Sequence, residues 1–238
     1  MTRIDGRAAD QLRPIEIIPN FNQFAEGSCL IRCGNTQVLC TASVEEKTPP
    51  HVPDGEGWVT AEYSMLPRAN RERSRRDVSK LKLSPRSAEI QRLIGRALRC
   101  AVDLKKLGPR SITVDCDVLQ GDGGTRTASV TGGFVALSFA LYKLMEQGIL
   151  KEMPLKTCVA AISAGIVNDE LLLDLCYEED SAAQVDLNCV MTGEGELVEL
   201  QGTGEGRSFT IKEQQALVEL CAKGIQEVQA IQKAALGG

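Results

Sequence analysis

The sequence predicts an α+β fold built from two sheet-and-helix halves that pack together. The first observation is the order of the strand-like and helix-like segments along the chain. The second is Met153-Pro154, which marks a possible internal boundary. The third is size, because 238 residues with 43% hydrophobic content can fill one large core or two small ones. We therefore expect an N-terminal domain over residues 1–154 and a C-terminal domain over residues 155–238.

Strands dominate the beginning of the N-terminal half, over residues 14–44. Residues 28–32 and 36–44 lie on either side of Gly34-Asn35, a dipeptide typical of a hairpin turn. A loop rich in proline and glycine follows over residues 45–57. The pattern then predicts a short strand over residues 58–63.

Residues 67–82 form a basic stretch. Seven basic residues face two acidic ones, so the local charge is 7 − 2 = +5 in a chain of net charge −5. The basic residues are Arg68, Arg71, Arg73, Arg75, Arg76, Lys80 and Lys82. Two interpretations stay open: a solvated loop, or a surface that contacts a phosphate backbone or another subunit. No aromatic residue interleaves with these cations, so the stretch does not indicate base stacking.

A long helix is predicted to follow the basic stretch. Ser84 is suited to its N-cap and Pro85 to its first position, while Gly108-Pro109 ends the helical pattern. Arg86 lies in the first turn, where the helix dipole disfavours a cation. It either points to solvent or awaits an anion. Another face of the helix carries Arg92, Arg96 and Arg99.

The most informative stretch, residues 120–129, reads Gln-Gly-Asp-Gly-Gly-Thr-Arg-Thr-Ala-Ser. Residues 111–119 before it alternate between apolar and polar side chains, which is the period of a strand. Residues 130–145 after it are small or apolar, and Gly148 is placed as a helix C-cap. The order is therefore strand, glycine-rich turn and helix N-terminus.

This glycine-rich turn is suited to an anion. Glycines let backbone N–H groups approach a ligand closely, and the start of a helix adds a positive dipole end, so phosphate is the simplest ligand. Gly124, Thr125 and Arg126 would supply backbone, hydroxyl and guanidinium donors. The stretch matches neither a P-loop nor a dinucleotide fingerprint. A plain tight turn is the alternative.

The C-terminal half reads as a second set of strands closed by a helix. The pattern predicts strands over residues 157–167, 170–177, 185–191 and 196–201, with an acidic loop over 178–181. Thr210 and Glu213 form a capping box for the last helix.

Two aspartates in this half stand out. Asp180 ends the acidic loop, and Asp186 lies inside an apolar strand, where burial of an unpaired charge is costly. Asp186 and Asn188 share one strand face, so a solvated polar face explains the pattern as well as a function does. The functional interpretation is that the two carboxylates hold Mg²⁺ or Mn²⁺, or that one of them is a general acid.

Composition excludes several classes of chemistry. The chain has nine cysteines in no Cys-x-x-Cys arrangement and a single histidine, so structural zinc is not expected. A Ser-His-Asp or Cys-His hydrolase would depend on His51, which lies in a proline-rich loop. Unpaired cysteines fit a reducing cytoplasm, and residues 1–14 are too polar for a signal peptide. No apolar run predicts a membrane span.

Several of these motifs together resemble the bacterial ribonuclease PH family over essentially the whole chain. They are Asp5-Gly6-Arg7, the basic stretch, Ser84-Pro85-Arg86, the Gly-rich run from Gln120 to Thr127, the run from Tyr177 to Ser181, and the run from Asp186 to Thr192. Members of that family are phosphate-dependent 3′→5′ exoribonucleases that trim tRNA precursors, and they form rings of six subunits as trimers of dimers.

The resemblance implies a site, a cofactor and partners. Arg86, Gly124, Thr125 and Arg126 would bind inorganic phosphate as co-substrate, and Asp180 and Asp186 would bind Mg²⁺ or Mn²⁺ or protonate the leaving oxygen. Arg68, Arg71, Arg73, Arg75, Arg76, Arg92 and Arg96 would serve RNA binding or assembly. The expected partners are RNA with a single-stranded 3′ end and further copies of the chain, in the cytoplasm and without a membrane.

Two other functions remain possible at this stage. One is a non-catalytic RNA-binding ring subunit of the same fold, although such relatives tend to lack the phosphate-loop arginine or the acidic pair. The other is a phosphate-binding enzyme that acts on small molecules, which leaves the basic stretch unexplained.

Overall fold

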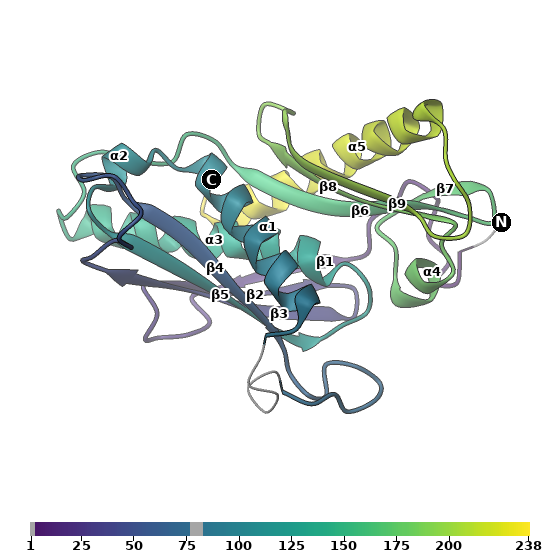
Figure 1. The fold of residues 1–238 in the computed structure, drawn as a ribbon, viewed down its shortest axis with the longest axis horizontal. Coiled ribbons are helices and arrows are strands. Elements are labelled where there is room, and N and C mark those ends of the chain that lie inside the picture. The colour runs from purple at the N-terminus through teal and green to yellow at the C-terminus, as the bar shows by residue number, and fades with distance from the viewer. Residues whose placement is uncertain (1–2, 77–82) are drawn as a thin grey trace.

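The fold is that of a computed structural model, which describes residues 3–76 and 83–238. Asp77, Lys80 and Lys82 of the basic stretch lie outside this described part. The expected α+β architecture is confirmed, with two sheets and the helices layered between and over them (Figure 1).

The first sheet has five strands in the order β1-β2-β3-β5-β4. They are β1 (Ile15–Pro19), β2 (Gly27–Cys33), β3 (Thr36–Glu45), β4 (Trp58–Met65) and β5 (Ser111–Gln120). The hairpin at Gly34-Asn35 is present, since β2 and β3 pair antiparallel from Cys33 opposite Thr36. The central strand β5 pairs antiparallel with β3 and parallel with β4.

Helices α1 (Pro85–Ala101) and α3 (Thr125–Glu146) cover one face of this sheet. Ser84 caps α1 through its side chain, with Pro85 in the first position, as the sequence predicts. The sequence predicts one helix that continues up to Gly108-Pro109, but α1 ends at Ala101, and Asp103 caps a separate short helix, α2 (Leu104–Leu107). Gly148 has a left-handed backbone with φ of +70° and follows the C-cap Gln147 of α3.

The second sheet has four antiparallel strands in the order β7-β6-β8-β9. They are β6 (Val159–Val167), β7 (Glu170–Leu173), β8 (Val185–Thr192) and β9 (Leu197–Gly204). Helix α5 (Ile211–Ala235) begins at the predicted capping box of Thr210 and Glu213 and packs on β6. Every residue of β6 is buried, because Val159 and Ala161 face the core around α3 while Ala160 and Ile162 face α5.

Helix α3 is therefore the centre of the molecule. It contacts β2 and β3 of the first sheet and β6 of the second. It is long and apolar enough to cross a membrane by length and composition, but 78% of its most apolar window is buried inside the fold. A helix that is apolar all round is expected in such an enclosed position.

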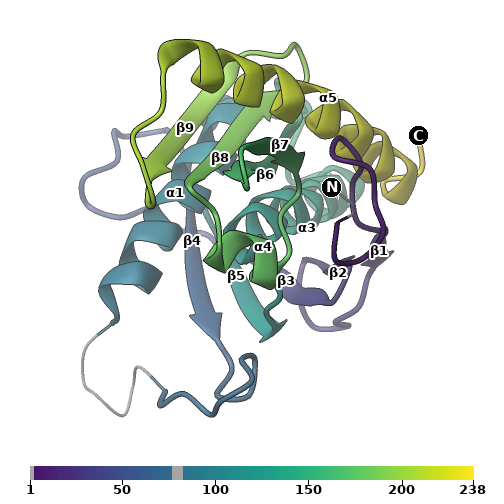
Figure 2. The same ribbon diagram turned by 90° about the vertical axis from the view of Figure 1, so that its right-hand side faces the viewer.

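One predicted element has a different secondary structure from the one expected. The sequence interpretation places an acidic loop over residues 178–181 and extends the preceding strand to residue 177. In the structure β7 ends at Leu173 and a short helix, α4 (Tyr177–Ser181), carries the acidic residues. The Cys176 N–H donates to the side chain of Glu179, which closes the first turn of this helix. Figure 2 shows α4 close to the ends of β3 and β5.

Candidate active site

The glycine-rich turn between β5 and α3 has the conformation that its sequence predicts. Gly123 and Gly124 have φ of +74° and +64°, a region that side chains rarely adopt. Gly124 is the N-cap of α3, and it offers no side chain to the first N–H groups of the helix. Those N–H groups have no partner within the helix itself, so they are free to bind an anion.

The turn is held by the hairpin between β2 and β3. The Thr36 hydroxyl accepts a hydrogen bond from the Asp122 N–H at 2.8 Å and donates to the Gly123 carbonyl at 2.7 Å. Asn35 donates its side-chain amide to Asp122 Oδ2 at 3.0 Å. The backbone of the turn is thus fixed before any ligand binds.

Gly123 also brings the two halves into contact. A Cβ atom at this position would lie 2.4 Å from the Leu175 carbonyl oxygen, so no side chain fits. On the other side of this contact, the Tyr177 N–H donates to Asp122 Oδ1 at 3.2 Å. The glycine-rich turn therefore packs directly on the N-terminus of α4.

A buried ionic cluster joins the N-terminal segment to the same region. Arg13 makes two hydrogen bonds to the Asp174 carboxylate, at 2.6 and 3.0 Å, and donates to the Asp122 carbonyl. Arg3 pairs with Glu179 of α4 at 2.6 Å. Burial opposes ionisation of Glu179, but hydrogen bonds from Arg3 and the Cys176 N–H outweigh it and lower its pKa. No role was predicted from the sequence for Arg3, Arg13, Asp174 or Glu179.

Asp186 faces the first half of the molecule. Val185, Leu187 and Cys189 of β8 pack in the core around α5, whereas Val190 packs in the core around α3. Asp186 and Asn188 therefore share the inner face, and Asn188 donates to Asp186 Oδ2 at 3.0 Å. Within the described part of the chain, Asp186 Oδ1 is buried without a hydrogen-bond partner. Burial, together with the nearby Asp180 carboxylate, raises the pKa of Asp186 to about 6.

Asp180 lies near the C-terminal end of α4, beside both predicted phosphate-binding arginines. Burial raises the pKa of Asp180, while the charges of Arg86 and Arg126 oppose that rise. The charge of Arg126 also lowers the pKa of Asp186 against the effect of burial. The structure thus brings together four side chains from α1, α3, α4 and β8 that lie as much as 100 residues apart in sequence.

Arg126 is held in place from two sides. Its Nη1 donates to Gln201 Oε1 of β9 at 2.6 Å and lies 3.4 Å from Glu89 Oε1 of α1, and 17% of the side chain is exposed. The preceding Thr125 shares a 2.9 Å hydrogen bond with the buried Tyr63 hydroxyl. The sequence analysis missed Gln201, Glu89 and Tyr63. The polar Gln201 in a predicted strand was the one available signal.

The predicted RNA-binding or assembly residues form two groups in space. Arg68, Arg71, Arg73, Arg75 and Arg76 are exposed on the loop after β4. Arg71 reaches α4, where it forms an ion pair with Glu178. Arg92 and Arg96 are exposed on α1, and Arg96 makes a two-pronged ion pair with Glu199 of β9.

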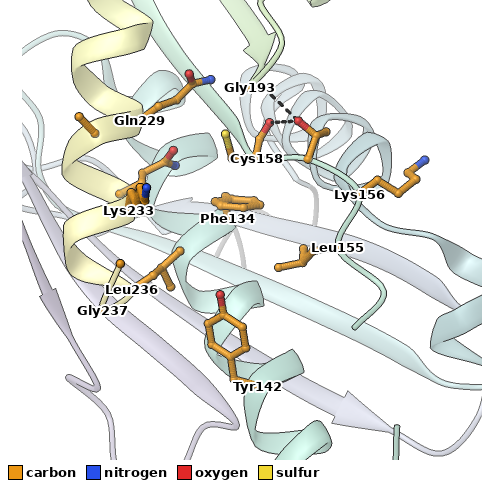
Figure 3. A pocket seen from close by; sticks show the side chains of 14 residues that line it. Phe134, Tyr142, Leu155, Lys156, Cys158, Gly193, Gln229, Lys233, Leu236 and Gly237 are labelled. Carbon is orange, nitrogen blue, oxygen red and sulfur yellow. Dashed lines mark hydrogen bonds between the residues drawn. The ribbon is translucent and has the colours of Figure 1, made fainter. Parts of the chain in front are cut away.

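A separate cavity of about 680 Å³ lies between the ends of α3 and α5 (Figure 3). Phe134, Tyr142 and Leu155 supply apolar walls, and Lys156 and Lys233 also line it. It includes none of the predicted site residues, so the glycine-rich turn, the arginines and the acidic pair remain the candidate site.

The chain matches models of a known protein family and is similar to a curated member of it. A model of the 3′ exoribonuclease family, domain 1, matches residues 11–141, and a model of domain 2 of the same family matches residues 157–224. A ribonuclease PH of Moorella thermoacetica is 54% identical over 238 residues, which is 100% of this chain and 95% of the relative.

Solved structures resemble the chain over nearly its whole length. An archaeal exosome core is 27% identical with a TM-score of 0.76, covering 97% of this chain and 91% of the other. The exosome of Archaeoglobus fulgidus with RNA bound to its active site is 27% identical with a TM-score of 0.77, covering 96% and 91%. Rice (Oryza sativa) Rrp46, at 19% identity, a TM-score of 0.80 and coverage of 98% and 100%, shows the shared fold.

Proposed function

This chain belongs to the 3′ exoribonuclease family, and we propose that it removes nucleotides from the 3′ end of tRNA precursors and other RNAs with inorganic phosphate. It is a phosphate-dependent exoribonuclease. The observation that carries this function is the convergence of Arg86, Arg126, Asp180 and Asp186 beside the free N-terminus of α3. Nucleoside 5′-diphosphates are the expected products.

Inorganic phosphate is the nucleophile in this proposal. The N–H groups at Gly124 and Thr125 and the guanidinium of Arg126 hold the phosphate, and Arg86 clamps it from α1. One phosphate oxygen attacks the phosphorus of the last phosphodiester bond, and the bond to the 3′ oxygen breaks. Phosphoryl transfer depends mainly on positioning and charge neutralisation, which arginines and backbone dipoles provide without a histidine.

The acidic pair serves the leaving group. The departing 3′ oxygen takes up a proton, and a carboxyl with a pKa of about 6, such as that of Asp186, is partly protonated near neutral pH. Because a phosphoanhydride forms as the phosphodiester breaks, the reaction is expected to be reversible. The reverse reaction would add nucleotides from nucleoside diphosphates to an RNA 3′ end.

The same carboxylates fit a divalent cation. The buried, unpartnered Oδ1 of Asp186 is an atom whose charge a cation would satisfy. No group of three or more His, Cys, Asp or Glu side chains suited to a metal occurs in residues 3–76 and 83–238. Two carboxylates are enough for Mg²⁺ or Mn²⁺, because Mg²⁺ is usually held by one or two carboxylates, with water and substrate phosphates completing its shell. When bound, the ion would neutralise charge on the transferring phosphoryl group.

The test is a titration of phosphate against a single-stranded RNA. Nucleoside diphosphate should appear at a rate that saturates with phosphate and should be absent without it. Release of nucleoside monophosphates at a rate independent of phosphate would contradict the proposal. RNA binding without turnover would favour the non-catalytic ring subunit.

Assembly and location extend the proposal. One similar structure is an archaeal exosome core, and another is an exosome with RNA bound to its active site. We propose that this chain forms a homohexameric ring, a trimer of dimers, that binds RNA in the cytoplasm. The exposed arginines of the loop after β4 are the candidates for RNA contacts, subunit contacts or both.

Neutralising the arginines of this loop tests whether they contact RNA, another subunit or both. Changing Arg68, Arg73, Arg75 and Arg76 to glutamine should have one of two effects. If the arginines contact RNA, tRNA binding should weaken, and the slope of log affinity against log salt concentration should become shallower by about one unit per lost phosphate contact. If they contact another subunit, the mass measured by light scattering should fall. The matched control changes four exposed lysines elsewhere, Lys105, Lys151, Lys212 and Lys233, to glutamine. If affinity, slope and mass all match the wild type, the loop is merely solvated.

A further inference from the structure

An exposed tyrosine stands beside the candidate active site. Tyr177 is the first residue of α4, and 51% of its surface is exposed. Its backbone N–H is tied to Asp122 of the glycine-rich turn, so its position is fixed relative to the phosphate-binding loop. Within the described residues its hydroxyl makes no hydrogen bond. An aromatic side chain held in water by a fixed backbone needs an explanation other than core packing.

Arg71 of the basic loop lies over this ring. Its guanidinium carbon is 5.7 Å from the ring centroid, and its Nη2 forms the ion pair with Glu178, the next residue of α4. The Arg71 side chain is 77% exposed, and an exposed pair of this kind contributes little stability. Arg71 can therefore exchange a carboxylate partner for a phosphate without much loss.

Arg71, Asn70 and Tyr177 border a hollow of about 400 Å³ whose other wall is the glycine-rich turn at Gly121 and Asp122. Tyr177 and Asp180 are three residues apart on one helix, and side chains at this spacing lie on the same face, about 5–6 Å apart at Cβ. The hollow therefore shares the glycine-rich turn and helix α4 with the candidate active site.

The chemistry of this hollow matches single-stranded nucleic acid. Proteins bind such strands with cations along the backbone and aromatic rings on which bases stack. The basic stretch has no aromatic residue of its own in the sequence. In the fold, Tyr177, which comes 101 positions after Arg76 in the chain, lies beside this stretch. An arginine beside the ring can add a cation–π contact to a stacked base.

We propose that Tyr177 and Arg71 form a base-stacking subsite for a nucleotide near the 3′ end of the bound RNA. This inference rests on the proposed exoribonuclease function and adds to it a residue that recognises the substrate without taking part in bond breaking. Stacking accepts any base, so the subsite holds the strand in place without selecting its sequence.

The test combines a protein change with an RNA change. Tyr177→Ala should raise KM for a single-stranded oligoribonucleotide about 10-fold, with kcat and the KM for phosphate unchanged, because stacking of one base on an aromatic side chain contributes about this much. Tyr177→Phe should restore wild-type KM, since the ring stacks without its hydroxyl. Phe24→Ala is the matched control, an exposed aromatic residue in the loop before β2, far from the β3 end that holds the glycine-rich turn.

Oligoribonucleotides with one abasic position near the 3′ end complete the cycle. Removing the stacked base should weaken wild-type binding about 10-fold, yet leave binding to the Tyr177→Ala variant unchanged, because the two changes remove one shared contact. Additive effects at every abasic position would overturn the subsite. So would a Tyr177→Ala variant with reduced kcat and unchanged KM, or with altered mass by light scattering, which would make Tyr177 a structural or subunit-contact residue.

Different results would contradict the stacking subsite and the proposed function. A wild-type protein that releases no nucleoside diphosphate in the presence of phosphate contradicts the function. Binding of intact and abasic oligoribonucleotides, followed by fluorescence anisotropy, then still decides whether Tyr177 stacks on a base.

Discussion

Asp180→Asn and Asp186→Asn are each expected to abolish phosphorolysis, with a loss of at least about 10³-fold in kcat, while the protein stays folded and binds RNA. A carboxylate that holds a divalent ion or donates a proton contributes several kcal/mol at the transition state, and each 1.4 kcal/mol is about tenfold in rate. Asparagine keeps the size and the hydrogen-bonding capacity. RNA affinity should persist because the proposed RNA contacts are made by the arginines.

The controls separate this effect from loss of fold. Asp115→Asn is the matched variant, because Asp115 is also a half-buried strand aspartate whose pKa is raised by burial and by Glu62, yet it lies on β5 outside the site. It should retain activity. The Asp180→Asn, Asp186→Asn double variant should be little worse than the worse single variant, since the pair acts as a unit. Near wild-type turnover by both single variants would reduce the pair to a polar strand face.

The acidic pair also predicts two results that do not depend on activity. The raised pKa of Asp186, about 6 against an ordinary 3.8, favours folding below pH 3.8, and this contribution is lost as pH rises to 6. Asp186→Asn should therefore stabilise the metal-free protein at pH 7 by on the order of 3 kcal/mol, and not at pH 3.5. Mg²⁺ should raise the Tm of the wild type and not of the variant. An equal rise in both would remove Asp186 from the metal site.

Arg126→Ala is expected to lower kcat/KM for phosphate by about 10²–10³-fold, as removal of one transition-state donor does in other enzymes. The side chain is oriented by Gln201 and Glu89, so its guanidinium sits in place before phosphate arrives. The loss should be confined to phosphate use, with RNA affinity largely retained.

Arg110→Ala is the matched control for Arg126. Arg110 is also paired with a glutamate, Glu46, and its side chain is 19% exposed, but it lies just before β5, at the end of that strand away from the glycine-rich turn. Its loss should leave phosphate use unchanged. An Arg126→Ala variant that saturates with phosphate at the wild-type rate would disprove the assignment of this arginine to the phosphate.

Features set by neighbouring residues could be predicted from the sequence. The Gly34-Asn35 hairpin, the Ser84-Pro85 helix start and the Thr210 capping box each depend on residues within a few positions. The glycine-rich turn belongs to this group, because the conformation of Gly123 and Gly124 follows from their lack of a side chain. The inner placement of Asp186 follows from strand alternation in β8, although alternation alone does not say what covers that face.

Features that depend on distant partners could not be predicted. Arg13 is paired with Asp174, and Arg3 with Glu179, across more than 160 residues of sequence. The arginines of the polar N-terminal segment are therefore buried in ion pairs. The helix α4 was missed for the same reason, since buried Glu179 closes its first turn while paired to Arg3. Gln201 and Glu89 reach Arg126 from separate elements.

The central claim is that phosphate, not water, breaks the RNA chain at this site. The most direct measurement is mass spectrometry of the released nucleotide after reaction in H₂¹⁸O with unlabelled phosphate. The account predicts nucleoside 5′-diphosphate that contains no ¹⁸O. Nucleoside monophosphate carrying one ¹⁸O would show hydrolysis and would contradict it.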